Sequence, residues 1–230
     1  AEAIRELIKE LKLDLKVSVV LGDDLMTEKN KFSELNTKEM YSNEDFPAED
    51  KIASINAYLG AFPIAEALKS GADIVITGRS VDSAVTLGAC IYSFGWNEKE
   101  YDKLAAGSLA GHIIECGTQS TGGNFTDWEL VSKDLHQIGY PIVEVSEDGS
   151  FDCTKSKNST GMVSFGTVAE QMLYEIGDPQ AYILPDVICD FSNVKIEETE
   201  KDKVKISGAK GYPAPNQYKV CATYACLLYT

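Results

Sequence analysis

Apolar residues follow two different periods along the first half of the chain, and these periods predict its elements. Residues 2–12 and 53–69 carry apolar residues at the three- and four-residue spacing of a helix. Residues 15–21 and 73–77 are short runs rich in β-branched residues, and the second is continuously apolar, as in a parallel strand covered on both faces. A glycine turn after 73–77 leads into a helical pattern over 81–93. This order of strand, turn and helix is typical of an open α/β sheet.

The second half of the chain changes character. Residues 98–116 read as two further helical segments, and 165–176 as another. An Asp-Gly turn at 148–149 predicts a β-hairpin between two short strands. Further strands are expected at 182–189, 194–198, 203–207 and 218–224. We therefore predict an α/β fold, with an open, largely parallel sheet and flanking helices in residues 1–138. An α+β part with antiparallel hairpins follows in 139–230.

Two polar stretches interrupt these patterns. Residues 27–50 carry only scattered apolar residues and a proline, which predicts a long excursion or lid with short helices. The acidic and basic run at 197–205 predicts a hairpin whose charged side chains face solvent.

The charge balance excludes some partners. The formal net charge is −15, whereas a protein that binds duplex nucleic acid needs a basic face to neutralise phosphates.

No apolar run reaches the roughly 18 residues of a membrane-spanning helix, and residues 1–11 lack the apolar centre of a signal peptide. We expect a cytoplasmic protein, or one of an organelle matrix in a eukaryote, that uses neither nucleic acid nor membrane. One arginine beside backbone amides can still bind a small anion against an acidic background.

The cysteines predict reduced thiols rather than a disulfide framework or a metal site. None of the six has the spacing of a zinc-binding pair, and most stand in apolar contexts, where a cysteine behaves as a small buried hydrophobe. No metal site is predicted.

Residues 77–82 (TGRSVD) are the sharpest candidate for ligand binding, because they join the end of a strand to the start of a helix. Ligands of open α/β sheets bind at this edge, and free N–H groups of a first helical turn favour anions. Gly78 allows close backbone approach, and Arg79 can clamp a carboxylate or phosphate. Ser80 and Asp82 complete the candidate site. In the alternative interpretation, Ser80 caps the helix and Arg79 pairs with Asp82 on the surface.

A second candidate is the helical segment that ends in GTQSTGGN. His112 and Glu115 share a face of the helix at a spacing of three residues, and Cys116 joins them. His112 and Glu115 are the predicted catalytic residues, suited to acid–base work, although a buried structural histidine fits the same pattern. The following loop offers hydroxyls, an amide and free backbone donors for ligand contact. Its predicted ligand-binding residues are Gln119, Thr121, Gly122, Gly123 and Asn124.

Two more polar residues are predicted at the site. Asp23 follows the strand at 15–21 and, paired with Asp24, could contact a metal, a ribose or a substrate hydroxyl, or instead cap the next helix. Asn56 is a polar residue within the helical pattern at 53–69, from which it could reach a pocket. Tyr58, in the same pattern, reads as a packing residue.

Four segments together resemble the acyclic terpene utilisation (AtuA) family. They are INAYLGAFPIAEALKSGADIVITGRSVDSAVTLG (55–88), LAAGSLAGHIIECGTQSTGGNFTDW (104–128), YEIGDPQAYILPDVICDF (174–191) and YKVCATYA (218–225). Family members are larger, so the resemblance implies that this chain is truncated at both ends. It lacks an amino-terminal strand with a glycine turn, and the continuation after the last segment.

The resemblance implies a role in the catabolism of branched acyclic terpenoids through acyl-CoA thioesters. We expect an enzyme or enzyme subunit of lyase, hydratase or isomerase type that acts on a small anionic substrate. A CoA thioester is the expected substrate, and no cofactor is predicted. The alternative is a non-catalytic accessory or binding subunit of an acyl-CoA enzyme complex, and the sequence leaves open a homo-oligomer or a partner subunit. An oxidoreductase is disfavoured because no GxGxxG follows a strand.

Overall fold

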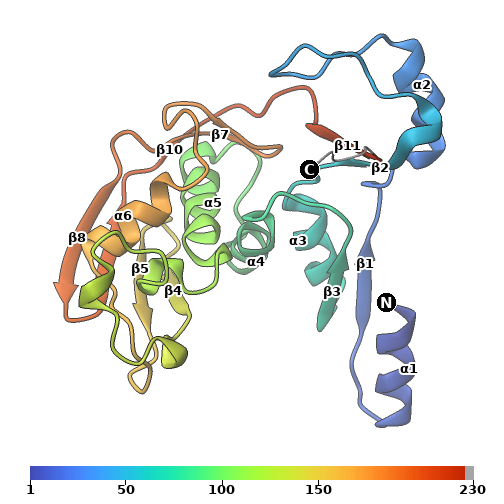
Figure 1. Ribbon diagram of the computed structural model, residues 1–230. Helices are drawn as coiled ribbons and strands as arrows, with labels where there is room; N and C mark the ends of the chain where they lie inside the picture. Colours follow the sequence, from blue (N-terminus) through green and yellow to red (C-terminus); the bar gives the residue numbers. More distant parts are fainter. Residues whose placement is uncertain (226–230) are drawn as a thin grey trace.

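The structure is a computed structural model that describes residues 1–225, and it mixes helices with short parallel and antiparallel sheets (Figure 1). Its α-helices are α1 (Glu2–Glu10), α2 (Lys29–Glu34), α3 (Phe62–Lys69), α4 (Ala84–Phe94), α5 (Tyr101–Glu115) and α6 (Phe165–Leu173). The strands of the first half are β1 (Val17–Val20), β2 (Ile52–Ala57) and β3 (Ile74–Thr77). Those of the second half are β4 (Pro141–Val145), β5 (Phe151–Lys155), β6 (Tyr182–Ile183), β7 (Ile188–Asp190), β8 (Lys195–Glu200), β9 (Lys203–Ser207), β10 (Lys210–Tyr212) and β11 (Val220–Tyr224).

The parallel part of the fold is a pair of strands. β1 and β3 run parallel in register, with Val17 opposite Ile74 and Val20 opposite Thr77, as the α/β prediction requires. All four residues of β3 are partly exposed, so the expectation of a strand covered on both faces is wrong. Among residues 1–225, β1 and β3 pair only with each other, and a two-stranded sheet gives helices too little surface to bury either face completely.

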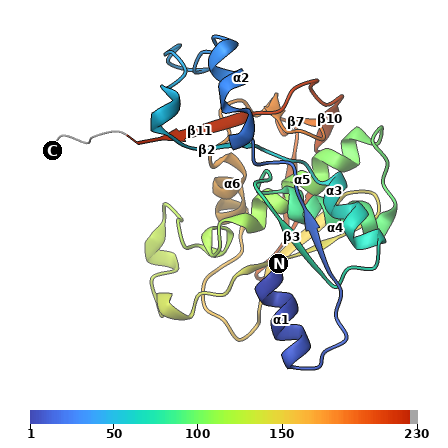
Figure 2. The ribbon, with the colours of Figure 1, turned by 90° about the vertical axis from the view of Figure 1, so that its right-hand side faces the viewer.

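The structure corrects the helix predicted over residues 53–69. Its first part is the strand β2, which pairs antiparallel with β11, and only Phe62–Lys69 is helical. Figure 2 shows β11 lying along β2, below α2. The alanines and leucine of this segment suit either structure, so the pairing with a strand more than 160 residues later decides the outcome. Gly60 and Pro63 mark the change from strand to helix.

Helix α5 forms the centre of the core. The two helical segments predicted in 98–116 are one continuous helix, and all residues from Leu104 to Ile113 are buried. Glycine allows this close packing, since a Cβ at Gly107 would lie 2.7 Å from Leu87 of α4. Figure 1 shows α5 between α4 and the strands of the second half. The core cluster takes residues from both halves of the chain, and the boundary at residue 138 stays a prediction.

The predicted hairpins of the second half are confirmed. β4 and β5 pair around the Asp-Gly turn and continue through β9 to β8 in one antiparallel sheet. A second sheet has the order β10-β7-β6. The single strand expected at 182–189 is wrong, because this segment forms the two short antiparallel strands β6 and β7, and β10 was not predicted. The five cysteines of the described residues are free, as expected, and Cys226 lies outside those residues. Within residues 1–225, no helix combines the length and apolar character needed to cross a membrane.

The excursion predicted at 27–50 is present. It holds α2 and two short 3₁₀ helices, and Phe32 stacks on Phe46 with ring centroids 6.1 Å apart. Leu35, Met40 and Tyr41 are exposed on it. This excursion begins directly after Asp24 and ends where β2 starts.

Candidate functional site

The ends of β1, β2 and β3 are tied together by one carboxylate. Asp23, which follows β1, is 8% exposed. Its Oδ2 accepts hydrogen bonds from the backbone N–H of Arg79 at 2.7 Å and from Asn56 Nδ2 at 3.0 Å. The Asp23 carbonyl also accepts the N–H of Ala57 at 2.8 Å. Asp23 therefore does not cap the next helix; it joins three chain segments at the carboxyl ends of the parallel strands.

The approach of Asp23 requires a glycine in the neighbouring turn. A Cβ at Gly78 would overlap the Asp23 carboxyl group. The Arg79 backbone N–H is the main cause that lowers the pKa of Asp23 below its ordinary value, with a smaller contribution from Asn56 and burial acting in the opposite direction. Glycine thus has a steric role here, since it lets the turn close on an ionised carboxylate.

A cavity of about 360 Å³ opens at this point. Its lining consists of predicted site residues: Asp23, Asn56, Gly78, Arg79, Ser80 and Asp82. Asn56 reaches it from β2 rather than from the helix that was predicted. The structure thus brings together residues from three separate stretches of the sequence.

The alternative interpretation of the 77–82 turn is wrong in both of its parts. Helix α4 begins at Ala84 with Ser83 as its N-cap residue, so Ser80 does not cap it. Within residues 1–225, Arg79 makes no ion pair with Asp82 or with any other carboxylate. Its guanidinium carbon instead lies 5.4 Å from the ring centroid of Tyr58.

A lysine that the sequence did not indicate stands beside the same ring. Lys219 Nζ lies 5.6 Å from the ring centroid of Tyr58 and makes no ion pair within the described residues. Its backbone carbonyl accepts the N–H of Tyr58 at 3.0 Å, which fixes the start of β11 beside the site. Tyr58 is therefore more than a packing residue, because it holds two cations by cation–π attraction.

The predicted catalytic residues His112 and Glu115 contact each other, but they do not line this cavity. His112 Nδ1 lies 2.6 Å from Glu115 Oε1 on α5, and the two side chains are 1% and 13% exposed. His112 Nε2 is buried and has no hydrogen-bond partner. The Tyr182 ring covers the imidazole with the ring centroids 6.1 Å apart. Burial is the main cause that raises the pKa of Tyr182 to about 12.

The pair and the cavity are close neighbours through the start of α4. Gly111 packs against Ser83 so tightly that a Cβ on Gly111 would lie 2.7 Å from the Ser83 Cα. Gly111 precedes His112, and Ser83 follows Asp82, which lines the cavity. The negative charge of Asp82 also contributes, after burial and Glu115, to the raised pKa values of Cys116 and Tyr182. Burial raises the pKa of Cys116 above its ordinary value, so this thiol is poorly suited to nucleophilic attack.

The glycine loop at 117–124 supports the pair and does not line the cavity. Gln119 Nε2 donates to Gln171 Oε1 at 2.7 Å, and Gln171 Nε2 donates to the His112 carbonyl at 2.8 Å. Thr121 is fully buried. Gly122 has φ +104°, while Gly123 and Asn124 are exposed. The loop therefore holds α5 in place through Gln171, and its last two residues face solvent.

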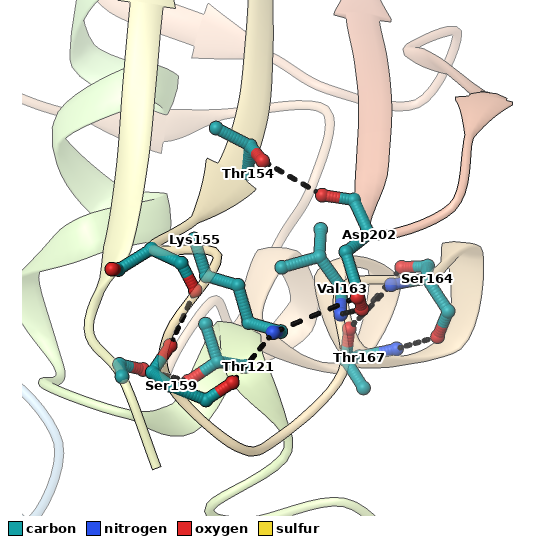
Figure 3. Close-up of polar contacts among 10 residues, drawn as sticks. Thr121, Thr154, Lys155, Ser159, Val163, Ser164, Thr167 and Asp202 are labelled. Carbon is teal, nitrogen blue, oxygen red and sulfur yellow. Dashed lines mark hydrogen bonds and ion pairs between the residues drawn. The ribbon is translucent and has the colours of Figure 1, made fainter.

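Buried Lys155 joins the segment after β5 to the turn between β8 and β9 (Figure 3). Lys155 Nζ donates to the Ser159 carbonyl at 3.0 Å and lies 3.6 Å from Asp202 Oδ2. The Thr121 carbonyl accepts the N–H of Met162 at 2.9 Å, which joins the loop to the segment after Ser159. Asp202 was predicted to face solvent with the rest of the 197–205 run, but it turns inward because Lys155 needs a counter-charge.

Asp186 is a second polar residue near the strand ends that the sequence did not indicate. Its Oδ2 accepts the N–H of Ala61 at 2.7 Å at the start of α3, and a Cβ on Gly60 would overlap its carboxyl group. Burial raises the pKa of Asp186 above its ordinary value, and backbone hydrogen bonds to Ala61 and Phe62 oppose this. The only local signal was a carboxylate in the apolar context LPDV.

Of three comparisons with known proteins, one found a match. The model of the family described as "Acyclic terpene utilisation family protein AtuA" matches residues 1–227 of the 230-residue chain. Comparison with curated proteins and with solved structures found no match. The family match includes every segment that builds the cavity and the His112–Glu115 pair, and the chain belongs to the acyclic terpene utilisation (AtuA) family.

Proposed function

We propose that the cavity beside Arg79 binds the negatively charged group of a small substrate in acyclic terpenoid catabolism. An acyl-CoA thioester or a related branched carboxylate is the expected class. The observation that carries this proposal is the state of Arg79. Arg79 lines the cavity, and its guanidinium has no carboxylate partner in residues 1–225, although the chain has 36 acidic residues.

The surroundings of Arg79 support anion binding. Asp23 is already held by two hydrogen bonds and leaves the guanidinium free. Tyr58 holds the arginine by cation–π attraction, which reduces the freedom lost on binding. Ser80 adds a hydroxyl to the cavity wall, and Lys219 adds a second positive charge at the ring of Tyr58. A planar carboxylate or a phosphate fits the forked donors of an arginine.

The chemistry that we propose is proton transfer by the His112–Glu115 pair. A carboxylate at 2.6 Å from Nδ1 keeps the proton on that nitrogen and leaves Nε2 as the basic atom. Such a pair suits a lyase, hydratase or isomerase, each of which moves a proton to or from carbon or oxygen. The close contact between Gly111, which precedes His112, and Ser83, which follows Asp82 of the cavity lining, supports this assignment. We place the reaction in the cytoplasm or an organelle matrix.

Arginine replacement tests the binding site. In Arg79→Gln, the affinity for a branched acyl-CoA should fall about 10–100-fold, because a hydrogen bond to a charged group contributes about 1.5–3 kcal/mol. Isothermal titration calorimetry with the thioester, the free acid and its methyl ester measures this. Arg5→Gln is the matched control, since Arg5 lies on α1 and donates to the Val17 carbonyl instead. Equal affinities of the two variants, or equal binding of the uncharged ester, would refute the proposal.

One observation favours the second candidate, a non-catalytic binding subunit of an acyl-CoA enzyme complex. The groups suited to proton transfer are buried and stand outside the cavity lining. A subunit of this kind would bind the thioester through Arg79 but leave it unchanged. Incubation with branched acyl-CoA thioesters and analysis of the products by mass spectrometry separate the two candidates. Turnover that is lost in His112→Gln supports the enzyme, and binding without turnover supports the subunit.

A further inference from the structure

Two buried polar atoms on α5 have no hydrogen-bond partner. They are Ser108 Oγ and His112 Nε2, and within residues 1–225 no other buried side-chain nitrogen or oxygen is left unpaired. The two residues are one helical turn apart, so their side chains lie on the same face of the helix. Both residues are 1% exposed. Buried polar atoms in folded proteins are nearly always paired with protein or with ordered water, so this arrangement indicates a missing partner.

The surroundings of these atoms supply at most one weak contact, from the Cys189 thiol to Ser108, and none to His112 Nε2. The Tyr182 ring lies against the imidazole, and Phe191 packs on Tyr182 with ring centroids 6.0 Å apart. The Cys189 thiol lies beside Ser108, and a thiol is at best a weak partner for a hydroxyl. The face of α5 that carries the two atoms is therefore covered by aromatic and sulfur-containing side chains of the segment that holds β6 and β7.

The position of the proton on the His112 ring determines which kind of hydrogen-bond partner Nε2 needs. Glu115 Oε1 lies 2.6 Å from Nδ1, and a carboxylate can only accept, so the proton of this hydrogen bond belongs to Nδ1; in the tautomer that carries only this proton, Nε2 presents a lone pair. A lone pair needs a donor. The Ser108 hydroxyl can donate or accept, so one hydroxylic molecule between the two atoms would satisfy both.

We propose that Ser108 Oγ and His112 Nε2 hold one hydroxylic molecule, a water in the resting protein, in a closed site behind Tyr182. The water donates to Nε2 and exchanges a hydrogen bond with Oγ. Tyr182 lies on the two-residue edge strand β6 and is itself only partly buried, so in this proposal its ring closes the site toward solvent. The site stands without any assumption about substrate. If the proposed function also holds, this water lies on the basic atom of the proton-transfer pair, which favours hydration over the other reaction types.

Nitrogen NMR of the unmodified protein tests the histidine state. The chain has two histidines, so the signals of His112 and His136 can be separated by a His136→Gln variant. We expect His112 to show a protonated Nδ1 and an unprotonated Nε2 that accepts a hydrogen bond. A protonated Nε2, in the neutral or in the doubly protonated ring, would overturn the proposal, because that nitrogen would then be a donor and no water could donate to it.

Chemical modification tests the role of Tyr182. Diethyl pyrocarbonate acylates the free nitrogen of neutral histidines, and the exposed His136 serves as an internal standard. In the unmodified protein and in Tyr182→Phe, His136 should react at least ten times faster than His112. In Tyr182→Ala, the rate at His112 should rise toward that of His136. Mass spectrometry of the two peptides gives both rates, and circular dichroism confirms that each variant is folded.

Two outcomes would refute the closed site. His112 could react as fast as His136 in the unmodified protein, or it could stay protected in folded Tyr182→Ala. If Tyr182→Ala does not fold, Tyr182→Leu keeps an apolar side chain and gives the same test. A high-resolution crystal structure adds a direct view: solvent density between Oγ and Nε2 supports the proposal, and a protein atom in hydrogen-bond contact with Nε2 excludes it. Neither result depends on Arg79, so failure of the substrate proposal leaves this test intact.

Discussion

The strand-end cavity and the centre of α5 differ in which of their polar groups have partners. At the cavity, the buried carboxylate of Asp23 is paired twice by protein donors, and the guanidinium of Arg79 remains unpaired toward solvent. In α5, one imidazole nitrogen is paired with Glu115, while Nε2 remains unpaired inside the protein. An unpaired cation at the surface costs little and is ready for an external anion. An unpaired buried atom is costly and implies an internal partner.

The two regions also differ in how they are fixed. The cavity depends on close approach of backbone and carboxylate at Gly78, whereas α5 is held by a fully buried helix face and by the glutamines that join it to the 117–124 loop. The contact between Gly111 and Ser83 connects the two. Changes at the turn should therefore affect stability and binding together, and changes in α5 should affect mainly the chemistry.

The largest effect is expected from Gly78→Ala. The added methyl group would overlap the Asp23 carboxyl group and break its hydrogen bonds to Arg79 and Asn56. We expect the free energy of unfolding to fall by about 3–5 kcal/mol, from overpacking and lost charge-assisted hydrogen bonds together. Urea denaturation measures this. Gly177→Ala is the control, since a Cβ there meets nothing within 4 Å. Similar stability of the two variants would show that the turn is not held by Asp23.

Glu115→Gln should have a smaller effect on stability and a larger one on the state of His112. The amide keeps the size of the side chain but loses the charge that holds the proton on Nδ1. We expect a loss of about 1.5–3 kcal/mol in the free energy of unfolding, the usual contribution of a hydrogen bond to a charged group. The same variant should populate the other tautomer of His112 in nitrogen NMR. An unchanged tautomer would show that Glu115 does not orient the ring.

The sequence predicted those features of the two regions that depend on neighbouring residues alone. The strands β1 and β3 follow from short β-rich runs, the hairpin from its Asp-Gly turn, and the face shared by His112 and Glu115 from the three-residue spacing of a helix. Arg79 and Asp82 were predicted because a strand–turn–helix junction is a local pattern. The structure places both at the cavity.

Residues brought in by distant pairing could not be predicted in the same way. Asn56 reaches the cavity from a strand that exists because β11 pairs with it, and the helical spacing of 53–69 gave no sign of this. Lys219 joins Tyr58 only through that pairing, and it follows no local motif. The Lys155–Asp202 pair likewise joins two hairpins, so Asp202 looked like any charged turn residue.

The two buried carboxylates at the strand ends should give opposite pH dependence. The pKa of Asp23 is lowered, chiefly by the Arg79 N–H, so the unfolded chain binds more protons and the contribution of Asp23 is lost as pH falls through its folded pKa. The pKa of Asp186 is raised by burial, so its contribution is lost as pH rises through its folded pKa. The stability difference between the unmodified protein and Asp23→Asn should therefore shrink below about pH 4.

The matched variant for this pH test is Asp186→Asn. The difference in the free energy of unfolding between Asp186→Asn and the unmodified protein should shrink as the pH rises above the ordinary pKa range of aspartate. Urea denaturation of the three proteins at a series of pH values gives both differences. Parallel curves for the two variants would contradict the opposite shifts.

Ser108→Ala should have the smallest effect, and its sign decides between an occupied and an empty site. If a water bridges Ser108 Oγ and His112 Nε2, the alanine removes one of its hydrogen bonds, and the free energy of unfolding should fall by about 0.5–1.5 kcal/mol. If the space is dry, the serine hydroxyl is a buried unpaired group, and its removal should stabilise the protein. Ser120→Ala calibrates the measurement, because the equally buried Ser120 hydroxyl donates to the Ile113 carbonyl. A gain in stability for Ser108→Ala beside a loss for Ser120→Ala would mean that α5 carries an unpaired hydroxyl, and the closed water site would have to be abandoned.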